Sequence, residues 1–168
     1  AIVVLDPAQF EQIAINLVGI LAEGGAQSFE AVQAKGAETI AKAASAVSAR
    51  MVHVSAIGAD ENSLSGYGRS KAAGEKAVLA AVPSATILRP SVVFGPDDHF
   101  LNLFAHMQEM APVVPLAGAH ARFQPIYVQD VVQAIVNAMV TPATIGRGYD
   151  LGGPQVYTLE ELVRFAGR

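Results

Sequence analysis

Short runs of apolar and β-branched residues alternate with longer stretches of helical periodicity along this chain. The strand-like runs are residues 1–5, 14–18, 51–55, 85–88, 124–128 and 149–151, and the main helical patterns are residues 28–46, 67–82, 97–110 and 130–140. Such an alternation is typical of βαβ units, in which helices cover a parallel sheet. We therefore predict an α/β fold. A capping box at Thr158 and Glu161 predicts one further helix near the C-terminus.

Composition narrows the possible partners. The chain has 168 residues, of which 52% are hydrophobic and only 15% are charged, against roughly 25% charged in typical soluble domains. Its net charge is −4 and no basic patch stands out, so we expect no nucleic-acid partner. It contains no Cys, which excludes disulfides, thiolate catalysis and Cys-based zinc sites.

The sequence opens without a recognisable signal peptide. Its longest uncharged stretch, residues 131–146, is interrupted by Gln133, Asn137 and Pro142. That stretch is also shorter than the ~20 residues that a membrane-spanning helix needs. We therefore expect a cytoplasmic protein without a membrane span.

Tyr67 and Lys71 are the pair of residues most suggestive of chemistry. They lie four positions apart in a predicted helix, so their side chains share one face. A free Tyr has a pKa of ~10, and a nearby cation favours the phenolate, so we expect Lys71 to lower the pKa of Tyr67. Such a phenol can exchange a proton with a carbonyl or an alcohol. The spacing alone is equally compatible with a solvated helix pair.

Small or polar residues follow three successive predicted strands. Asn16 and Gly19 end the first, Ser55 ends the second, and the third is followed by Pro90, Ser91, Val92 and Val93. Open α/β sheets bind ligands at the carboxyl ends of their strands. A hydroxyl at Ser55 could there hold a substrate carbonyl beside Tyr67, although Ser55 alone is more often an ordinary strand-end Ser.

Other sites find less support in the sequence. The four His residues lack zinc-type spacing, and we expect no metal site. His53 alternates with apolar neighbours and is interpreted as a core or edge histidine. No nucleophile elbow of the G-x-S-x-G type occurs.

Several motifs together resemble the extended and atypical short-chain dehydrogenases/reductases. They are Tyr67 and Lys71 followed by Ala-Ala-Gly-Glu, Leu88-Arg89-Pro90 with Gly95-Pro96, Val128-Gln129-Asp130-Val131, and Tyr149-Asp150-Leu151-Gly152-Gly153. Residues 16–21 and the helix that begins at Ser28 are most similar to one branch, which contains the nucleotide-binding accessory subunit of respiratory complex I and its bacterial relatives.

The resemblance implies a Rossmann-like, doubly wound domain over residues 1–168 that binds NAD or NADP, with residues from about 95 to 168 forming a smaller substrate-side lobe. By match of motif, Tyr67 is the acid–base residue, Lys71 holds the nicotinamide ribose and biases the Tyr, and Ser55 orients the substrate carbonyl. Two further groups are implied to lie along the cofactor: Asn16 and Gly19, and, near the nicotinamide carboxamide, Pro90, Ser91, Val92 and Val93.

One departure from the family concerns the phosphate-binding turn. The fifteen Gly residues form neither a GxGxxG nor a GxxGxxG motif, and too few residues precede Asn16 for the first βαβ units. We expect the chain to be part of a longer protein; the alternative is a domain that lacks the turn. Either way, we expect weak dinucleotide binding by this chain as given.

Two functions follow from the resemblance. One is an NAD(P)-dependent oxidoreductase or epimerase-like enzyme with an unidentified small-molecule substrate. The other is a non-catalytic nucleotide-binding subunit or assembly factor that associates with respiratory-complex subunits at the periphery of the inner membrane. Because members of the family often pair through the helix that carries Tyr67 and Lys71, a homodimer is also expected.

Overall fold

The computed structural model describes residues 12–98, 100–110, 115–116 and 118–167. The strand suggested by the apolar start of the sequence, residues 1–5, lies outside these ranges. The chain divides into two compact units, of which the first comprises Ala1–Arg89 and Gln133–Asp150 and the second Pro90–Val132 and Leu151–Arg168. Each unit is described by itself below.

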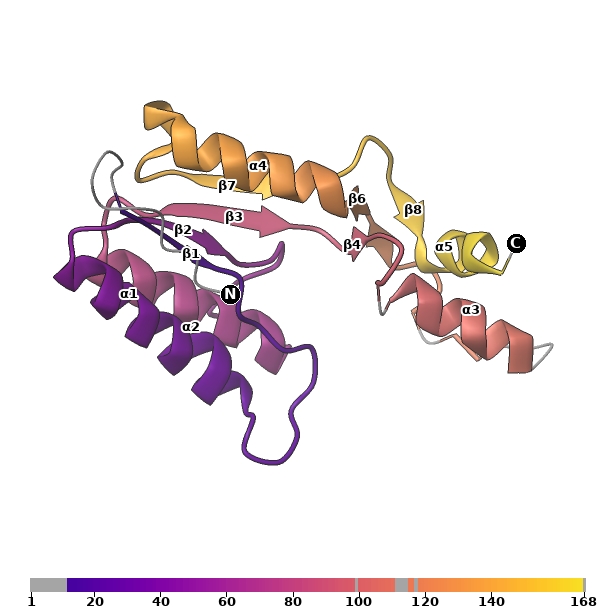
Figure 1. The fold of residues 1–168 in the computed structure, drawn as a ribbon. Coiled ribbons are helices and arrows are strands. Elements are labelled where there is room, and N and C mark those ends of the chain that lie inside the picture. The colour runs from indigo at the N-terminus through magenta and orange to yellow at the C-terminus, as the bar shows by residue number, and fades with distance from the viewer. Residues whose placement is uncertain (1–11, 99, 111–114, 117, 168) are drawn as a thin grey trace. The chain divides into compact units, whose positions relative to one another are not determined.

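A four-stranded sheet in the order β1-β2-β3-β7 forms the centre of the first unit (Figure 1). Its strands are β1 (Ile13–Asn16), β2 (Arg50–Val54), β3 (Thr86–Pro90) and β7 (Gly148–Leu151). The first three are parallel, with Asn16 opposite His53 and Val54 opposite Leu88. The predicted α/β fold with a parallel sheet is confirmed. The register also brings the carboxyl ends of β1 and β2 to the same edge of the sheet.

Two helices, one before β2 in the sequence and one after it, cover one face of this sheet. They are α1 (Gly36–Ala46) and α2 (Gly66–Ala81), and they pack on each other and on the strands (Figure 1). Small side chains make this layer thin: Ala37, Ala41 and Ala44 of α1 are buried together with Val78 of α2 and Met51 of β2.

The single helix predicted over residues 28–46 is divided into two parts. A π-helical segment, η1 (Glu30–Lys35), precedes α1. Gly74 of α2 lies so close to η1 that a Cβ atom there would come within 2.3 Å of the carbonyl oxygen of Gln33. This close approach accompanies the wider turn, and π-helical turns are frequent next to functional sites. The periodicity of the sequence gave no sign of it.

Alternation along β2 directs its side chains to opposite faces of the sheet. Met51 packs in the core under α1 and α2, whereas Arg50 reaches the end of α4 (Val128–Val140). The Arg50 guanidinium donates hydrogen bonds to the carbonyl oxygens of Ala138, Met139 and Thr141 at 2.8–3.0 Å. A buried cation therefore satisfies the carbonyl groups that the last turn of α4 leaves free.

In the second unit, the structure describes two small sheets and, besides the start of α4, the helices α3 (Leu101–Met110) and α5 (Leu159–Ala166). Strand β4 (Val93–Phe94) pairs in parallel with β6 (Ile126–Tyr127), and β5 (Arg122–Phe123) pairs antiparallel with β8 (Tyr157–Thr158). The helices α3 and α5 pack against each other. The predicted capping box is confirmed, because Thr158 and Glu161 exchange side chain to backbone hydrogen bonds at the start of α5.

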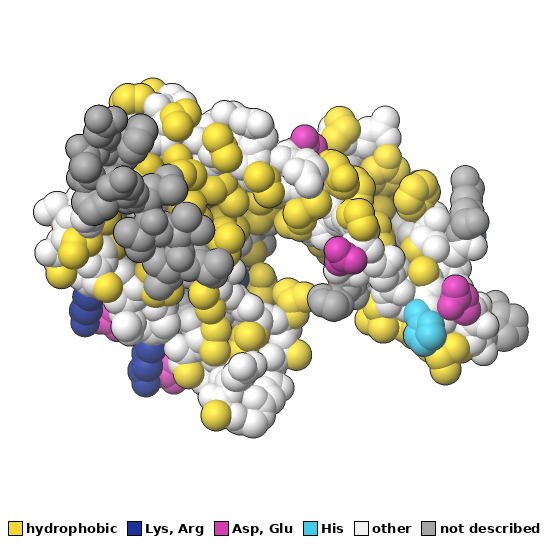
Figure 2. Space-filling view, in the orientation of Figure 1, with side chains coloured by type: hydrophobic (Ala, Val, Ile, Leu, Met, Phe, Trp, Pro, Cys, Tyr) yellow, Lys and Arg dark blue, Asp and Glu magenta, His cyan; other side chains and the backbone are white. Residues whose placement is uncertain are grey.

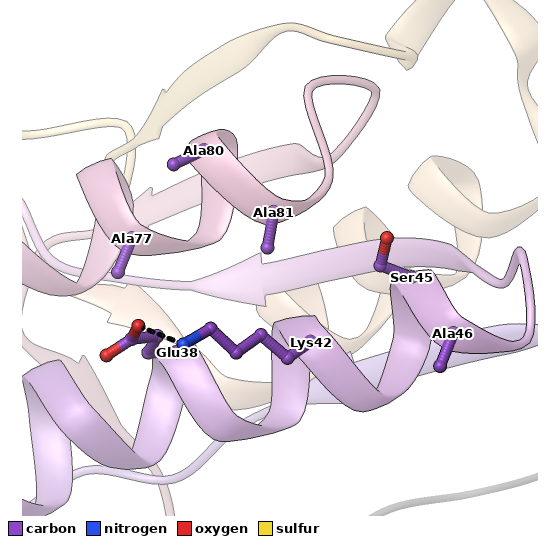
Figure 3. A pocket seen from close by; sticks show the side chains of 7 residues that line it. All are labelled: Glu38, Lys42, Ser45, Ala46, Ala77, Ala80 and Ala81. Atoms are coloured by element: carbon purple, nitrogen blue, oxygen red, sulfur yellow. Dashed lines mark ion pairs between the residues drawn. The ribbon is translucent and has the colours of Figure 1, made fainter.

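Much of the face shown in Figure 2 is uncharged, in keeping with the low content of charged residues. None of the helices that the structure describes is both long enough and apolar enough to cross a bilayer. A shallow groove of about 430 Å³ lies between α1 and α2 (Figure 3). It is lined by Glu38, Lys42, Ser45 and Ala46 of α1 and by Ala77, Ala80 and Ala81 of α2.

Candidate active site

Tyr67 and Lys71 lie in the first turns of α2, which begins at Gly66 after an extended Ser65. The Lys71 Nζ atom lies 5.9 Å from the centre of the Tyr67 ring, so the structure brings the two side chains together as their spacing predicts. Lys71 is only 7% exposed. The Tyr67 ring is half-buried, and Phe29 packs against it edge to face at 5.9 Å.

The predicted effect of Lys71 on the pKa of Tyr67 is not found. Burial raises the pKa of the Tyr67 phenol above its ordinary value. The reason is geometric: the ammonium lies over the ring at 5.9 Å from its centre, and the loss of solvent around the phenol dominates. In this arrangement Tyr67 is a protonated phenol at neutral pH, which suits a proton donor.

Burial also acts on Lys71, and in the opposite direction. It lowers the pKa of the ammonium, while the carboxylate of Glu75, one helical turn further along α2, partly restores it. The Lys71 Nζ atom also lies against the backbone of Gly19, where an added Cβ would approach it to 3.0 Å. Gly19 therefore leaves room for the ammonium at the end of β1.

Ser55 follows the last residue of β2 and is 4% exposed. Its backbone N–H donates to the carbonyl oxygen of Leu88 at 2.7 Å, which ties the strand end to β3. Within the part of the chain that the structure describes, its hydroxyl has no hydrogen-bond partner. A buried hydroxyl left without a partner is costly and uncommon, and a catalytic role is one of the explanations for such a group.

Asn16 and His53 form a buried hydrogen-bonded pair at the neighbouring strand ends. The Asn16 Oδ1 atom accepts the backbone N–H of Val18 at 3.0 Å, so the Asn16 amide nitrogen is the group that faces His53 Nδ1, also at 3.0 Å. Nδ1 must then be unprotonated. Burial lowers the pKa of His53 to about 4, assisted by the charge of Lys71. His53 is a core histidine, as interpreted from the sequence, and it orders the loop after β1.

The segment Pro90, Ser91, Val92 and Val93 belongs to the second unit. Backbone hydrogen bonds fix it there: the Ser91 N–H donates to Leu151, and the Val92 carbonyl accepts from Ile126. The first unit therefore contains five of the predicted site residues, namely Asn16, Gly19, Ser55, Tyr67 and Lys71. Residues 90–93 belong to the second unit.

Two charged residues near the site received no role from the sequence. Arg89 donates two hydrogen bonds to the carboxylate of Glu75, at 2.8 Å and 2.6 Å. Both residues belong to the motifs that carry the family resemblance. The spacing of four positions between Lys71 and Glu75 was the sequence signal that could have identified Glu75 as a neighbour of Lys71. Among the described residues, no group of three or more His, Asp or Glu side chains is arranged to hold a metal ion.

Comparison with known proteins places this chain in a family. The model of the RmlD substrate binding domain matches residues 20–158. The mitochondrial NADH dehydrogenase [ubiquinone] 1 alpha subcomplex subunit 9 of Arabidopsis thaliana is 40% identical over 89% of this chain and 38% of its own length. The ceramide reductase of Caulobacter vibrioides is 38% identical over 80% of this chain and 43% of its own length. The chain thus spans less than half of these relatives.

Solved structures share the fold at lower identity. A dTDP-4-dehydrorhamnose reductase from Clostridium acetobutylicum superposes with a TM-score of 0.79 at 16% identity, covering 92% of this chain and 60% of that protein. A dTDP-glucose 4,6-dehydratase from Bacillus anthracis, solved with NAD, gives 0.75 at 19%, with coverages of 92% and 55%. The dTDP-4-dehydrorhamnose reductase of the same species, solved with NADP, gives 0.71 at 20%, with 92% and 60%. The likeness establishes the Rossmann-like fold.

Proposed function

The chain belongs to the RmlD substrate binding domain family, and from this membership we propose that it forms the acid–base part of an NAD(P)-dependent oxidoreductase or epimerase acting on a carbonyl or an alcohol. The observation that carries the proposal is the buried Lys71, whose ammonium lies over the Tyr67 ring and against Gly19 at the end of β1. The family resemblance of the Tyr67–Lys71 helix gives these groups their roles.

The residues present fit a nicotinamide nucleotide on their donor chemistry. Lys71 offers an ammonium to ribose hydroxyls, and Gly19 leaves the space beside it free of a side chain. Asn16 supports the same loop from behind, because its side chain is held by His53 and Val18. We propose that Pro90, Ser91, Val92 and Val93 serve the carboxamide. The bound nicotinamide supplies or accepts the hydride.

Proton transfer is the task of this chain's own residues. Tyr67, kept protonated by burial, donates its phenolic proton to the carbonyl oxygen as that oxygen gains negative charge. The Ser55 hydroxyl, which has no partner among the described residues, donates a hydrogen bond to the same oxygen. Lys71, whose ammonium lies over the Tyr67 ring, holds the ribose hydroxyls beside this phenol. The reverse sequence removes the proton from an alcohol.

Tyr67→Phe tests the proposal because it removes the proton and keeps the ring that packs on Phe29. We expect turnover to fall by about 10² or more, as for loss of a general acid, while NADH or NADPH binding, measured by titration calorimetry, persists. Lys71→Met should weaken that binding. Lys76→Met is the matched control, since Lys76 is an exposed residue of the same helix that pairs with Glu61. Unchanged turnover in Tyr67→Phe would exclude the acid–base role.

The first substrates to assay are lipids of the ceramide class, because a ceramide reductase is among the relatives. Turnover is followed by the absorbance of the reduced nicotinamide in both directions. NAD and NADP are compared side by side, since solved relatives of the fold carry either one.

A second candidate is a non-catalytic nucleotide-binding subunit of a respiratory complex. It is supported by the 40% identity to the plant NADH dehydrogenase subunit. This role places the chain at the periphery of the inner membrane, and the wild-type protein should copurify with respiratory-complex subunits. A free protein that turns over substrate and copurifies with none of them would favour the enzyme.

The family resemblance also supports a homodimer through α2, which contributes Ala77, Ala80 and Ala81 to the groove between α1 and α2 (Figure 3). Light scattering on wild type and on Ala80→Glu would test it. A dimer that the substitution converts to monomers supports the assignment, and a monomeric wild type contradicts it.

A further inference from the structure

Lys71 is a cation that has been removed from water. It is 7% exposed. Two described residues that face it from outside its own helix supply no negative charge: Gly19 is uncharged, and His53 on β2 is buried and neutral at physiological pH. Tyr67, on its own helix, is a protonated phenol. A buried ammonium without an anion loses its proton readily, because burial penalises the charged form.

Glu75 supplies a negative charge on the same helix as Lys71. It lies one turn after Lys71 on α2, is 8% exposed, and acts against the effect of burial on the pKa of Lys71. Side chains at this spacing lie on the same helix face. Among the residues that the structure describes, Glu75 is the carboxylate with a resolved influence on Lys71.

Arg89 fixes the position of the Glu75 carboxylate and interacts with the same negative charge as Lys71. The guanidinium of Arg89, on β3, donates in a two-pronged arrangement to both Glu75 oxygens at 2.8 Å and 2.6 Å. Its outer side faces Asp150 of β7 at 3.6 Å, and Gly148 leaves space for it there. One buried carboxylate is therefore shared between two cations, Lys71 and Arg89.

We propose that Glu75 is a positioning residue that keeps Lys71 charged in its buried site, and that Arg89 sets how much of the Glu75 charge Lys71 experiences. The inference rests on the proposed function, in which the ammonium of Lys71 must hold ribose hydroxyls. It adds the means by which the chain maintains that charge.

The test is the titration of Lys71 itself, followed by NMR of lysine labelled at the ε-carbon. The chain has four lysines, Lys35, Lys42, Lys71 and Lys76, and the signal absent from Lys71→Met identifies the one of interest. In Glu75→Gln we expect its midpoint to fall by about one pH unit or more, as for loss of a neighbouring opposite charge. In Arg89→Met we expect the midpoint to rise, because Glu75 then serves Lys71 alone.

Opposite shifts of the Lys71 midpoint in the two variants would distinguish an effect of charge from a loss of structural support. Both substitutions break the same Glu75–Arg89 pair, so a purely structural role would move Lys71 in the same direction in both variants. That result, or an unchanged midpoint in Glu75→Gln, would overturn the proposal. Should Glu75→Gln fail to fold, a lowered midpoint in Arg89→Met is sufficient to overturn it.

Glu38→Gln is the matched control, because Glu38 and Lys42 form an exposed ion pair at the same spacing on α1. It should leave the Lys71 midpoint unchanged. NADH binding measured across the same pH range separates this inference from the proposed function. A shifted Lys71 midpoint without any dinucleotide binding supports the inference about charge and contradicts the function.

Discussion

His53 makes the stability of the fold depend on pH. The imidazole is 2% exposed, and its Nδ1 atom accepts a hydrogen bond from Asn16. Burial lowers its pKa from 6.5 to about 4. Protonation would place an N–H group of His53 against the N–H group of the Asn16 amide. Turning that amide around would break the hydrogen bond that Asn16 Oδ1 accepts from the Val18 N–H. The folded state therefore resists the proton that the unfolded chain accepts.

The sign and size follow from the two pKa values. Between pH 6.5 and about 4 the unfolded chain binds more protons at His53, so the free energy of unfolding rises with pH in this range. The contribution is complete above pH 6.5 and is lost as the pH falls through this window. A shift of this size corresponds to about 3 kcal/mol in total, of which about 2 kcal/mol is lost by pH ~5.

Urea unfolding followed by far-ultraviolet circular dichroism, at pH values from 7.5 to 5, measures this contribution. In His53→Gln the amide oxygen can still accept from Asn16 but cannot titrate. We expect this variant to lose about 2 kcal/mol less stability than wild type over that range. His120→Gln is the control, because His120 is exposed and should follow wild type. Equal losses in wild type and His53→Gln would refute the reasoning.

Three substitutions test the packing. Gly74→Ala should cost about 1–3 kcal/mol of unfolding free energy, since its Cβ would meet a backbone oxygen at 2.3 Å, whereas Gly66→Ala, with ordinary contacts, should be nearly neutral. Arg50→Met should cost about 2–4 kcal/mol by leaving buried carbonyls unpaired, against less than about 1 kcal/mol for the exposed Arg164→Met. Thr158→Ala should cost about 1 kcal/mol by removing the cap of α5. Denaturant titrations measure all of them, and a neutral Gly74→Ala or Arg50→Met would contradict the packing described.

Local signals in the sequence located most of the elements. The helix expected over residues 67–82 is α2 (Gly66–Ala81), and the strand expected over residues 51–55 is β2 (Arg50–Val54). These elements depend on periodicity and on nearby breakers such as Pro83, which act within a few residues. The position of Lys71 beside Tyr67 was predictable for the same reason, because one helical turn fixes it.

Contacts between distant residues explain two of the failures, and a local hydrogen-bonded turn explains the third. Arg50 caps a helix that lies about ninety positions later in the sequence, and nothing near Arg50 indicates this. The π-helical turn of η1 accompanies a close approach by Gly74, which lies on another helix. The helix expected over residues 97–110 begins only at Leu101, after Asp98 has accepted hydrogen bonds from the backbone of Phe100 and Leu101.

The pKa of Tyr67 shows why charge spacing alone misleads. The sequence identifies a cation four residues away but not how much water surrounds the pair. In the structure, burial raises the pKa of Tyr67 and lowers the pKa values of Lys71 and His53. It therefore favours the neutral form of all three side chains. Without a counter-charge the site would hold a neutral phenol, a neutral imidazole and a weakened ammonium. The sequence places Glu75 four positions after Lys71, but only the structure shows that Glu75 is buried and that its charge opposes the effect of burial on the pKa of Lys71.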